Sequence, residues 1–255
     1  MITDLLPTLA IALPLGAALG FFGGLFGIGG GIIAIPLLVI GFGMEQPLAQ
    51  GTALVMMAPN LLIGFWRYCQ RHPLAPGAML SIGLSATLVT WWMAGFANRL
   101  DPVLLKVVFS AFLALLGLNL LRPRKRQAGD GGRLPAKAAL AGIGALGGCS
   151  MGLLGIGGGL LATPLLAGLG VRQVVAQSLS LALVAPSSLA ALSAYASAGR
   201  VDWQLGLPMA LGGLLTVSPG VALAHRLPER RMRLAFAVML VLASVWLALG
   251  SGGGR

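Results

Sequence analysis

Ten apolar segments follow one another along the 255-residue chain with little between them. Most are about 20 residues long, the length at which an α-helix crosses the hydrocarbon core of a bilayer. Only 9% of the residues are charged, against about 25% in a typical soluble domain. The strands of a membrane β-barrel would alternate apolar and polar residues, and no such alternation is seen. The sequence therefore predicts an all-α polytopic membrane protein.

The apolar segments form two series of five. The first series is predicted at Leu5–Phe26, Gly30–Gly43, Pro47–Trp66, Leu74–Ala97 and Pro102–Leu121, and the second at Ala136–Leu154, Gly158–Gly170, Gln173–Ala198, Trp203–Ala224 and Met232–Leu249. The second segment of each series has only 13 or 14 residues, fewer than a straight membrane-spanning helix needs. Each series is therefore predicted to hold four full spans and one short, glycine-broken segment.

A glycine-rich motif leads into the short segment of both series. GLFGIGGGIIAIPLL, Gly24–Leu38, returns as GLLGIGGGLLATPLL, Gly152–Leu166, with eleven of fifteen positions identical. After the motif, further residues recur at a constant offset of 127 positions, among them Gln50 as Gln177 and Pro59 as Pro186. Such an internal repeat indicates one duplicated unit. We expect a first transmembrane repeat at residues 1–121, a basic linker at 122–135 and a second transmembrane repeat at 136–255.

The basic residues predict how the repeats are oriented. The linker is rich in Arg and Lys, which favours the cytoplasmic side. With five crossings in each half, the halves are inverted, and the stretches Arg67–His72 and Arg226–Arg233 also face the cytoplasm. With four crossings, the halves are parallel and Arg226–Arg233 lies outside, against the positive-inside rule. The charge pattern therefore favours inverted repeats.

The glycines have two interpretations. Gly16, Gly20 and Gly24 have the spacing that lets two membrane helices approach closely, and we expect that contact within one protomer. Gly27 and the run Gly29–Gly31 instead unwind a helix, because each glycine costs about 1 kcal/mol relative to alanine. Broken backbone in a bilayer is tolerated where it is buried or lines a cavity, and paired breaks in two repeats are typical of a transporter's binding site. A substrate site is favoured over packing alone.

A helix that restarts after such a break favours an anion. Its first N–H groups lack partners within the helix, and its dipole is positive at that end. Gln50 and Gln177, on the next segment of each half, would add donors. The breaks Gly27–Gly31 and Gly155–Gly159 are expected to meet near the membrane centre around one anion. The predicted substrate-binding residues are Gly27, Gly29, Gly30, Gly31, Gln50, Asn60, Gly155, Gly157, Gly158, Gly159, Gln177 and Ser187.

Several other functions fit the residues poorly. Gly148–Gly152 matches the G-x-S-x-G string of hydrolases, but it lies in an apolar segment with no His nearby, so no catalytic residue is expected. The two cysteines form no metal-ligand pattern, and neither a metal nor a cofactor is expected. All acidic residues lie in loops or at span ends, so none is placed to hold a cation inside the membrane. The net charge of +11 comes from loop residues that follow the positive-inside rule, so nucleic-acid binding is not expected.

The doubled G-x-G-G-G-x-x-x-x-P motif, each copy followed after 13 or 14 residues by Gln, resembles the sulfite exporter TauE/SafE family. GRVDW at Gly199–Trp203 and the basic Arg-Leu turn at Arg226 are similar to it as well. The resemblance covers nearly the whole chain. It implies a multi-pass permease of the bacterial or archaeal plasma membrane that moves a small sulfur-containing or organic anion, such as sulfite or a sulfonate.

Two other functions stay open. The chain would be a cation carrier or channel if the carbonyl groups of the glycine loops bind the solute. It would be a membrane scaffold without transport if the glycines only pack helices. The expected partners are a small anionic solute and the lipid bilayer, and a homodimer through spans other than Leu5–Phe26 is compatible with the sequence.

Overall fold

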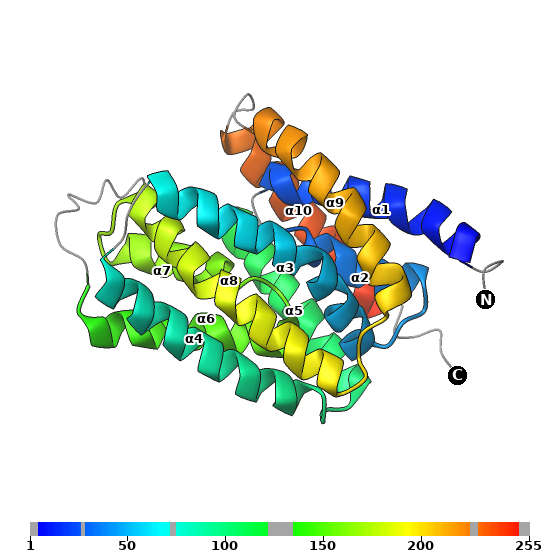
Figure 1. Ribbon diagram of the computed structural model, residues 1–255, viewed down its shortest axis with the longest axis horizontal. Coiled ribbons are helices and arrows are strands. Elements are labelled where there is room, and N and C mark those ends of the chain that lie inside the picture. Colours follow the sequence, from blue (N-terminus) through cyan, green and yellow to red (C-terminus); the bar gives the residue numbers. More distant parts are fainter. Residues whose placement is uncertain (1–4, 27–28, 72–74, 122–134, 225–228, 250–255) are drawn as a thin grey trace. The chain divides into compact units, whose positions relative to one another are not determined.

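The computed structural model describes residues 5–26, 29–71, 75–121, 135–224 and 229–249, and all regular structure within these ranges is helical (Figure 1). The ten helices of these ranges are α1 (Leu5–Phe26), α2 (Gly31–Gly41), α3 (Gln46–Arg71), α4 (Pro76–Ala97), α5 (Pro102–Leu121), α6 (Lys137–Leu154), α7 (Gly159–Gly168), α8 (Gln173–Ser197), α9 (Trp203–Ala224) and α10 (Glu229–Leu249). Each predicted segment corresponds to one helix. The predicted all-α architecture is therefore confirmed.

The helices differ in how far they reach. Among the described residues, seven helices are long and apolar enough to cross a membrane, and they are α1, α3, α4, α5, α6, α8 and α9. The apolar part of α10, Leu234–Ala248, is shorter. Helices α2 and α7 have 11 and 10 residues, a rise of about 15 Å at 1.5 Å per residue. Each of these two helices therefore covers about half of a hydrocarbon core of roughly 30 Å.

Glycine and proline set several helix boundaries. Proline is the first residue of α4 and of α5, a position where its missing N–H costs nothing. Gly155 follows α6 with φ of 65° and Gly170 follows α7 with φ of 81°. Both lie in the left-handed region, which glycine adopts without strain and which commonly ends a helix.

The chain forms two compact units that do not coincide with the two sequence repeats. Unit 1 contains Met1–Met56, Arg99–Arg124 and Arg200–Arg255, and unit 2 contains Met57–Asn98 and Lys125–Gly199. Unit 1 thus combines α1, α2 and α5 with α9 and α10, whereas unit 2 combines α4 with α6, α7 and α8. Helix α3 contributes its first part to unit 1 and its second part to unit 2. Each unit therefore draws helices from both halves of the sequence.

In unit 1, α1 packs closely on α9 through glycine. A Cβ atom added to Gly16, Gly20 or Gly24 would collide with the backbone of Met209, Gly213 or Val217, respectively, because the two helices are so close. The hydroxyl of Thr216 donates to the carbonyl of Ala17 across the same contact. The predicted close approach of the Gly16, Gly20 and Gly24 face is present, and α9 from the second half is its partner.

Unit 2 contains the equivalent pair, formed by α6 and α4. A Cβ atom on Gly144, Gly148 or Gly152 would collide with the backbone of Ile82, Ala86 or Thr90, respectively. The Thr90 hydroxyl donates to the Gly148 carbonyl at 3.0 Å. The three glycines follow those of α1 by 128 positions, and their three partners precede those on α9 by 127. The same contact is therefore made twice, each time between helices of different halves.

Contacts within unit 2 fix the directions of its helices. Along α4 and α8, Gly83 lies beside Ala182 and the Asn98 side chain donates to the Ala194 carbonyl, so these helices run parallel. Along α6 and α8, Gly147 lies beside Leu183 and the Tyr195 hydroxyl donates to the Gly152 carbonyl, so they are parallel too. Two consecutive spans would be antiparallel. The chain must therefore run back along α7 before α8 begins.

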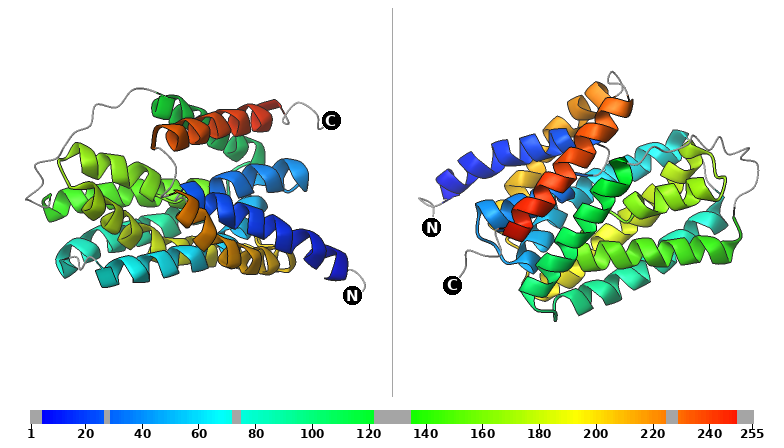
Figure 2. Two further views of the ribbon diagram at one scale, coloured as in Figure 1. Left: turned by 90° about the horizontal axis from the view of Figure 1, so that it is seen from above. Right: turned by 180° about the vertical axis from the view of Figure 1, so that it is seen from behind.

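Unit 1 shows corresponding directions. Gly16 to Gly24 of α1 pair in order with Met209 to Val217 of α9, so α1 and α9 are parallel. Gly51 lies beside Arg200 and Val55 beside Gly206, which makes the first part of α3 parallel to α9 as well. Helices α5 and α10 lie side by side and run in opposite directions, as the colour gradients in both views of Figure 2 show.

Candidate functional site

The first glycine break lies between α1 and α2 in unit 1. Gly29 and Gly30 both have positive φ, 71° and 85°, and Gly31 is the first residue of α2. A Cβ on Gly30 would lie 2.8 Å from the Leu19 carbonyl oxygen and 3.0 Å from the Met56 methyl carbon. The next residue after Leu19, Gly20, contacts the midpoint of the 22-residue α9 at Gly213. The start of α2 is therefore at mid-height of unit 1, whereas Gly27 lies outside the described residues.

The second break, between α6 and α7, lies at mid-height of its own unit, unit 2. Gly155 ends α6, and Gly157 and Gly158 are buried. The α-carbon of Gly158 approaches Gly147 so closely that an added Cβ would collide with the Gly147 backbone. The neighbouring Gly148 contacts Ala86, at the midpoint of the 22-residue α4. Helix α7 therefore starts at mid-height and runs about 15 Å toward one end of the unit.

The two breaks share a sequence but not a backbone conformation. Gly30 has φ of 85° and ψ of −12°, whereas its counterpart Gly158 has φ of −54° and ψ of −13°. Gly30 therefore requires glycine for its backbone angles. Gly158 requires glycine because of the space taken by Gly147.

Each short helix offers backbone donors at its start. In α2 the N–H groups of Ile33 and Ala34 donate to the Gly30 carbonyl at 3.1 and 3.0 Å, so the N–H of Gly31 precedes the first of these hydrogen bonds. In α7 the Leu160 N–H donates to Gly157 at 3.1 Å, and the N–H of Gly159 precedes it. Such first-turn N–H groups, at the positive end of the helix dipole, favour a negatively charged ligand.

The predicted polar residues differ in burial and in the unit to which they belong. Gln50 is fully buried in unit 1, and Asn60 is half-buried in the part of α3 that belongs to unit 2. Gln177, the counterpart of Gln50, is exposed on α8. Ser187 is fully buried, and its hydroxyl donates to the Leu183 carbonyl of its own helix at 2.7 Å. The predicted residues thus fall in two units, and their meeting around one anion stays a prediction.

A hydroxyl pair between α7 and α8 was not among the predicted site residues. The side-chain oxygens of Thr163 on α7 and Ser180 on α8 are 2.8 Å apart. Thr163 occupies the position of Ile35 in the other copy of the motif, so a search for residues shared by both copies passes over it. A search for positions where one copy is polar and the other apolar would have found it.

A second residue outside the prediction is Gln46, at the start of α3. Its side chain is 2% exposed, and among the described residues neither its amide nitrogen nor its amide oxygen has a hydrogen-bond partner. Gln46 precedes Gln50 by one helical turn and recurs as Gln173 at the constant offset. This repetition in both halves of the sequence could have identified Gln46 as a candidate site residue.

The hydrolase-like string lies within a continuous helix. Ser150 is buried in α6, and its hydroxyl donates to the Gly147 carbonyl at 2.9 Å. No group of three or more His, Cys, Asp or Glu side chains that would suit a metal ion is found among the described residues. The acidic residues Glu45, Asp101 and Asp202 lie at helix ends, outside the helix interiors.

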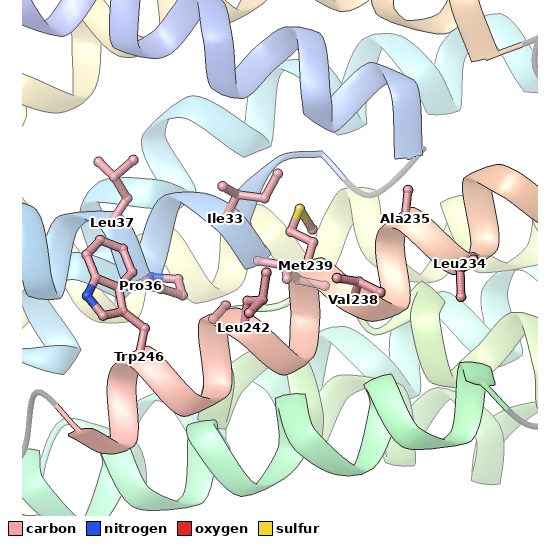
Figure 3. A pocket seen from close by; sticks show the side chains of 11 residues that line it. Ile33, Pro36, Leu37, Leu234, Ala235, Val238, Met239, Leu242 and Trp246 are labelled. Carbon is pink, nitrogen blue, oxygen red and sulfur yellow. The ribbon is translucent and has the colours of Figure 1, made fainter.

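A cavity of about 860 Å³ in unit 1 lies between α2 and α10 (Figure 3). Figure 3 shows Ile33, Pro36 and Leu37 of α2 opposite Val238 and Trp246 of α10. All eleven lining residues are apolar. Such a lining offers an anion almost no hydrogen-bond donors, so this cavity does not suit a charged solute.

Comparisons with known proteins cover almost the whole chain. The model of a family described as "Sulfite exporter TauE/SafE" matches residues 12–247. A probable membrane transporter protein of Xylella fastidiosa is 26% identical over 250 residues, covering 94% of this chain and 95% of the relative. Relatives with the same description are 26% identical in Methanocaldococcus jannaschii, covering 96% of both chains, and in Haemophilus influenzae, covering 92% and 96%. These proteins resemble the chain along more than nine-tenths of its length.

Proposed function

The chain belongs to the sulfite exporter TauE/SafE family, and on that premise we propose that it is a secondary transporter for a small sulfur-containing or organic oxyanion, such as sulfite or a sulfonate. Membership of a membrane transporter family, together with seven helices long enough to span a bilayer in the described part of the chain, makes it an integral membrane protein. The plasma membrane of a bacterium or archaeon is the proposed location.

The pair of half-length helices is the observation that carries the proposal of an anion. Each starts at mid-height of its own unit, and among the described residues the N–H groups of Gly31 and Gly159 precede the first hydrogen bond of their helices. A half-helix N-terminus at the middle of a membrane is a typical site for an anionic group in secondary transporters. In the described residues no carboxylate lies within a helix interior to hold a cation instead. The chemistry of the breaks therefore favours an anionic solute over a cation.

We further propose that the two repeats have inverted topology. In unit 1, α1 and α3 run parallel, and in unit 2, α4 and α6 run parallel. Helices α3 and α4 are consecutive spans, which cross a membrane in opposite directions. Helix α1 and its counterpart α6 then also cross in opposite directions, which is the arrangement of inverted repeats.

The same arrangement agrees with the positions of the basic loops. A Cβ on Gly77 would lie 3.3 Å from the side chain of Lys137, so α4 and α6 start at the same end of unit 2. The first residues of α4 and α6 therefore lie on one side of the unit. Since basic stretches precede both helices in the sequence, the positive-inside rule assigns that side to the cytoplasm. Most residues of these basic stretches lie outside the described residues, and so do Arg226–Pro228.

The proposed binding site combines the two breaks. A pseudo-two-fold axis between inverted repeats would bring Gly29–Gly31 and Gly155–Gly159 together near the membrane centre. Gln50, Gln177, Asn60 and Ser187 are the side chains proposed to surround the solute. Low dielectric around the site would strengthen the backbone dipoles relative to water.

The test is a flux assay with the purified protein in liposomes, combined with thermal-shift measurements. Sulfite, sulfate, thiosulfate, sulfoacetate and taurine form the solute panel, with sodium and potassium salts exchanged to detect cation dependence. Saturable flux and stabilisation by one of the anions are expected. A cation flux whose rate is the same with every anion of the panel would refute the proposal. The absence of any flux would refute it too.

A further inference from the structure

The two glycine breaks differ in the side chains beside them. In unit 2, the hydroxyl oxygens of Thr163 and Ser180 are 2.8 Å apart. Their counterparts in unit 1 are Ile35 and Ala53, both fully buried. One break therefore has a hydroxyl pair where the other has only hydrocarbon.

The hydroxyl pair joins α7 to α8, one helical turn after the start of α7. A Cβ on Gly159 would be 3.5 Å from the Cβ of Ser180 and 3.4 Å from Val184. Thr163 follows Gly159 by four residues, so both lie on the face of α7 that meets α8. Ser180 of the pair therefore packs against Gly159, whose N–H precedes the first hydrogen bond of the helix.

A count of hydrogens shows that the pair has one donor to spare. Two hydroxyl groups carry two hydrogens, and one of them is used in the bond between Thr163 and Ser180. In the described part of the chain, neither group makes another hydrogen bond. By contrast, the nearby hydroxyls of Ser187 and Ser188 donate to carbonyls of their own helix. Ser180 is only 5% exposed, and a buried donor without an acceptor is unfavourable.

We propose that the spare hydroxyl hydrogen donates to an oxygen of the anionic solute, so that the second break supplies a side-chain donor that the first break lacks. Thr163 and Ser180 are then specificity-determining residues that act together with the Gly159 N–H. Ile35, Ala53 and the Met56 methyl group offer no hydrogen-bond donor at the first break. This inference rests on the proposed function and makes the proposed site asymmetric.

The test compares single and double variants. In Thr163→Val or Ser180→Ala one hydroxyl remains and can still donate, so each affinity for the transported anion should fall by only about twofold to threefold. In the double variant no donor remains, and the affinity should fall by about tenfold. Thr87→Val is the matched control, because Thr87 is a half-buried residue of α4 whose hydroxyl donates to its own helix at Gly83. Its affinity should stay unchanged.

Affinity is measured by thermal shift and flux on folded, purified protein, first with sulfite and then with the other anions of the panel. A double variant that binds and transports like the Thr87→Val control would overturn this inference while leaving the proposed function intact. A wild-type protein that neither binds nor moves any of the anions would overturn both. A loss in each single variant as large as the loss in the double variant would also contradict it, because one shared donor predicts that the double loss exceeds each single one.

Discussion

Replacement of Gln46 by methionine should stabilise the folded protein. Gln46 is 2% exposed, and in the described structure both polar atoms of its amide lack a partner. A buried donor or acceptor without a partner costs about 1–3 kcal/mol. Taking the low end for each of the two atoms, the substitution should raise the free energy of unfolding by about 2 kcal/mol. Methionine is chosen because its unbranched, flexible side chain adapts to the same space.

Gln50→Met is the matched control for this experiment. Gln50 lies one turn further along α3, is likewise fully buried, and is not without a polar partner. Its replacement removes an interaction and should lower the free energy of unfolding by about 0.5–1.5 kcal/mol. The two Gln→Met substitutions should therefore change the free energy of unfolding in opposite directions. The two variants should differ by roughly 3 kcal/mol, about a hundredfold in the unfolding equilibrium constant.

The assay is reversible unfolding of both variants and the wild type in the same detergent, followed by tryptophan fluorescence. Equal destabilisation by Gln46→Met and Gln50→Met would refute the reasoning, because it would show that the Gln46 amide is hydrogen-bonded in the folded state. Flux of the Gln46→Met variant is measured in parallel. A variant that is more stable but slower would indicate that the amide is retained for transport at the expense of stability.

Three further predictions concern the topology, the second break and the assembly. Single cysteines placed in Arg67–His72, Arg122–Lys137 and Arg226–Arg233 of a chain without its native cysteines should resist an impermeant thiol reagent in intact cells, and labelling at the last stretch would contradict the inverted topology. Gly158→Ala should destabilise the protein by about 1–3 kcal/mol because its Cβ meets the Gly147 backbone, whereas Gly168→Ala, with open space around it, should be close to neutral when unfolding is measured. Chemical crosslinking in membranes should trap a homodimer, and a product that stays monomeric at every protein density would count against it.

The positions of the helices could be predicted from the sequence because the bilayer imposes a length and a polarity on each span. Each of the ten predicted segments became a helix whose bounds differ from the prediction by a few residues. The spacing of Gly16, Gly20 and Gly24 also predicted a close contact, and the contact is present. Its partner, α9, could not be predicted, because small residues permit approach by any helix and do not specify one.

The details of the candidate site were less accessible to sequence reasoning. Gly30 and Gly158 lie in identical pentapeptides, yet Gly30 has φ of 85° and Gly158 has φ of −54°. Glycine can adopt either conformation, so the surrounding tertiary structure decides between them. Candidate residues were chosen because they recur in both copies of the repeat, as Gln50 and Gln177 do. In the structure Gln50 is buried and Gln177 is exposed, so recurrence did not predict their surroundings. Thr163 and Ser180 differ from their counterparts and could be paired only when the packing of α7 on α8 was known.

The exchange of α4 and α9 between the halves has a consequence for biogenesis and ancestry. Helix α9, on which the glycine face of α1 packs, is synthesised more than 170 residues after α1. Until then, this face of α1 lacks its partner helix. A half expressed alone lacks the helix that its own glycine face requires, so two separately expressed halves should recover stability only when they are produced together. For the same reason, a single ancestral unit would have paired its first helix with the fourth helix of a second copy.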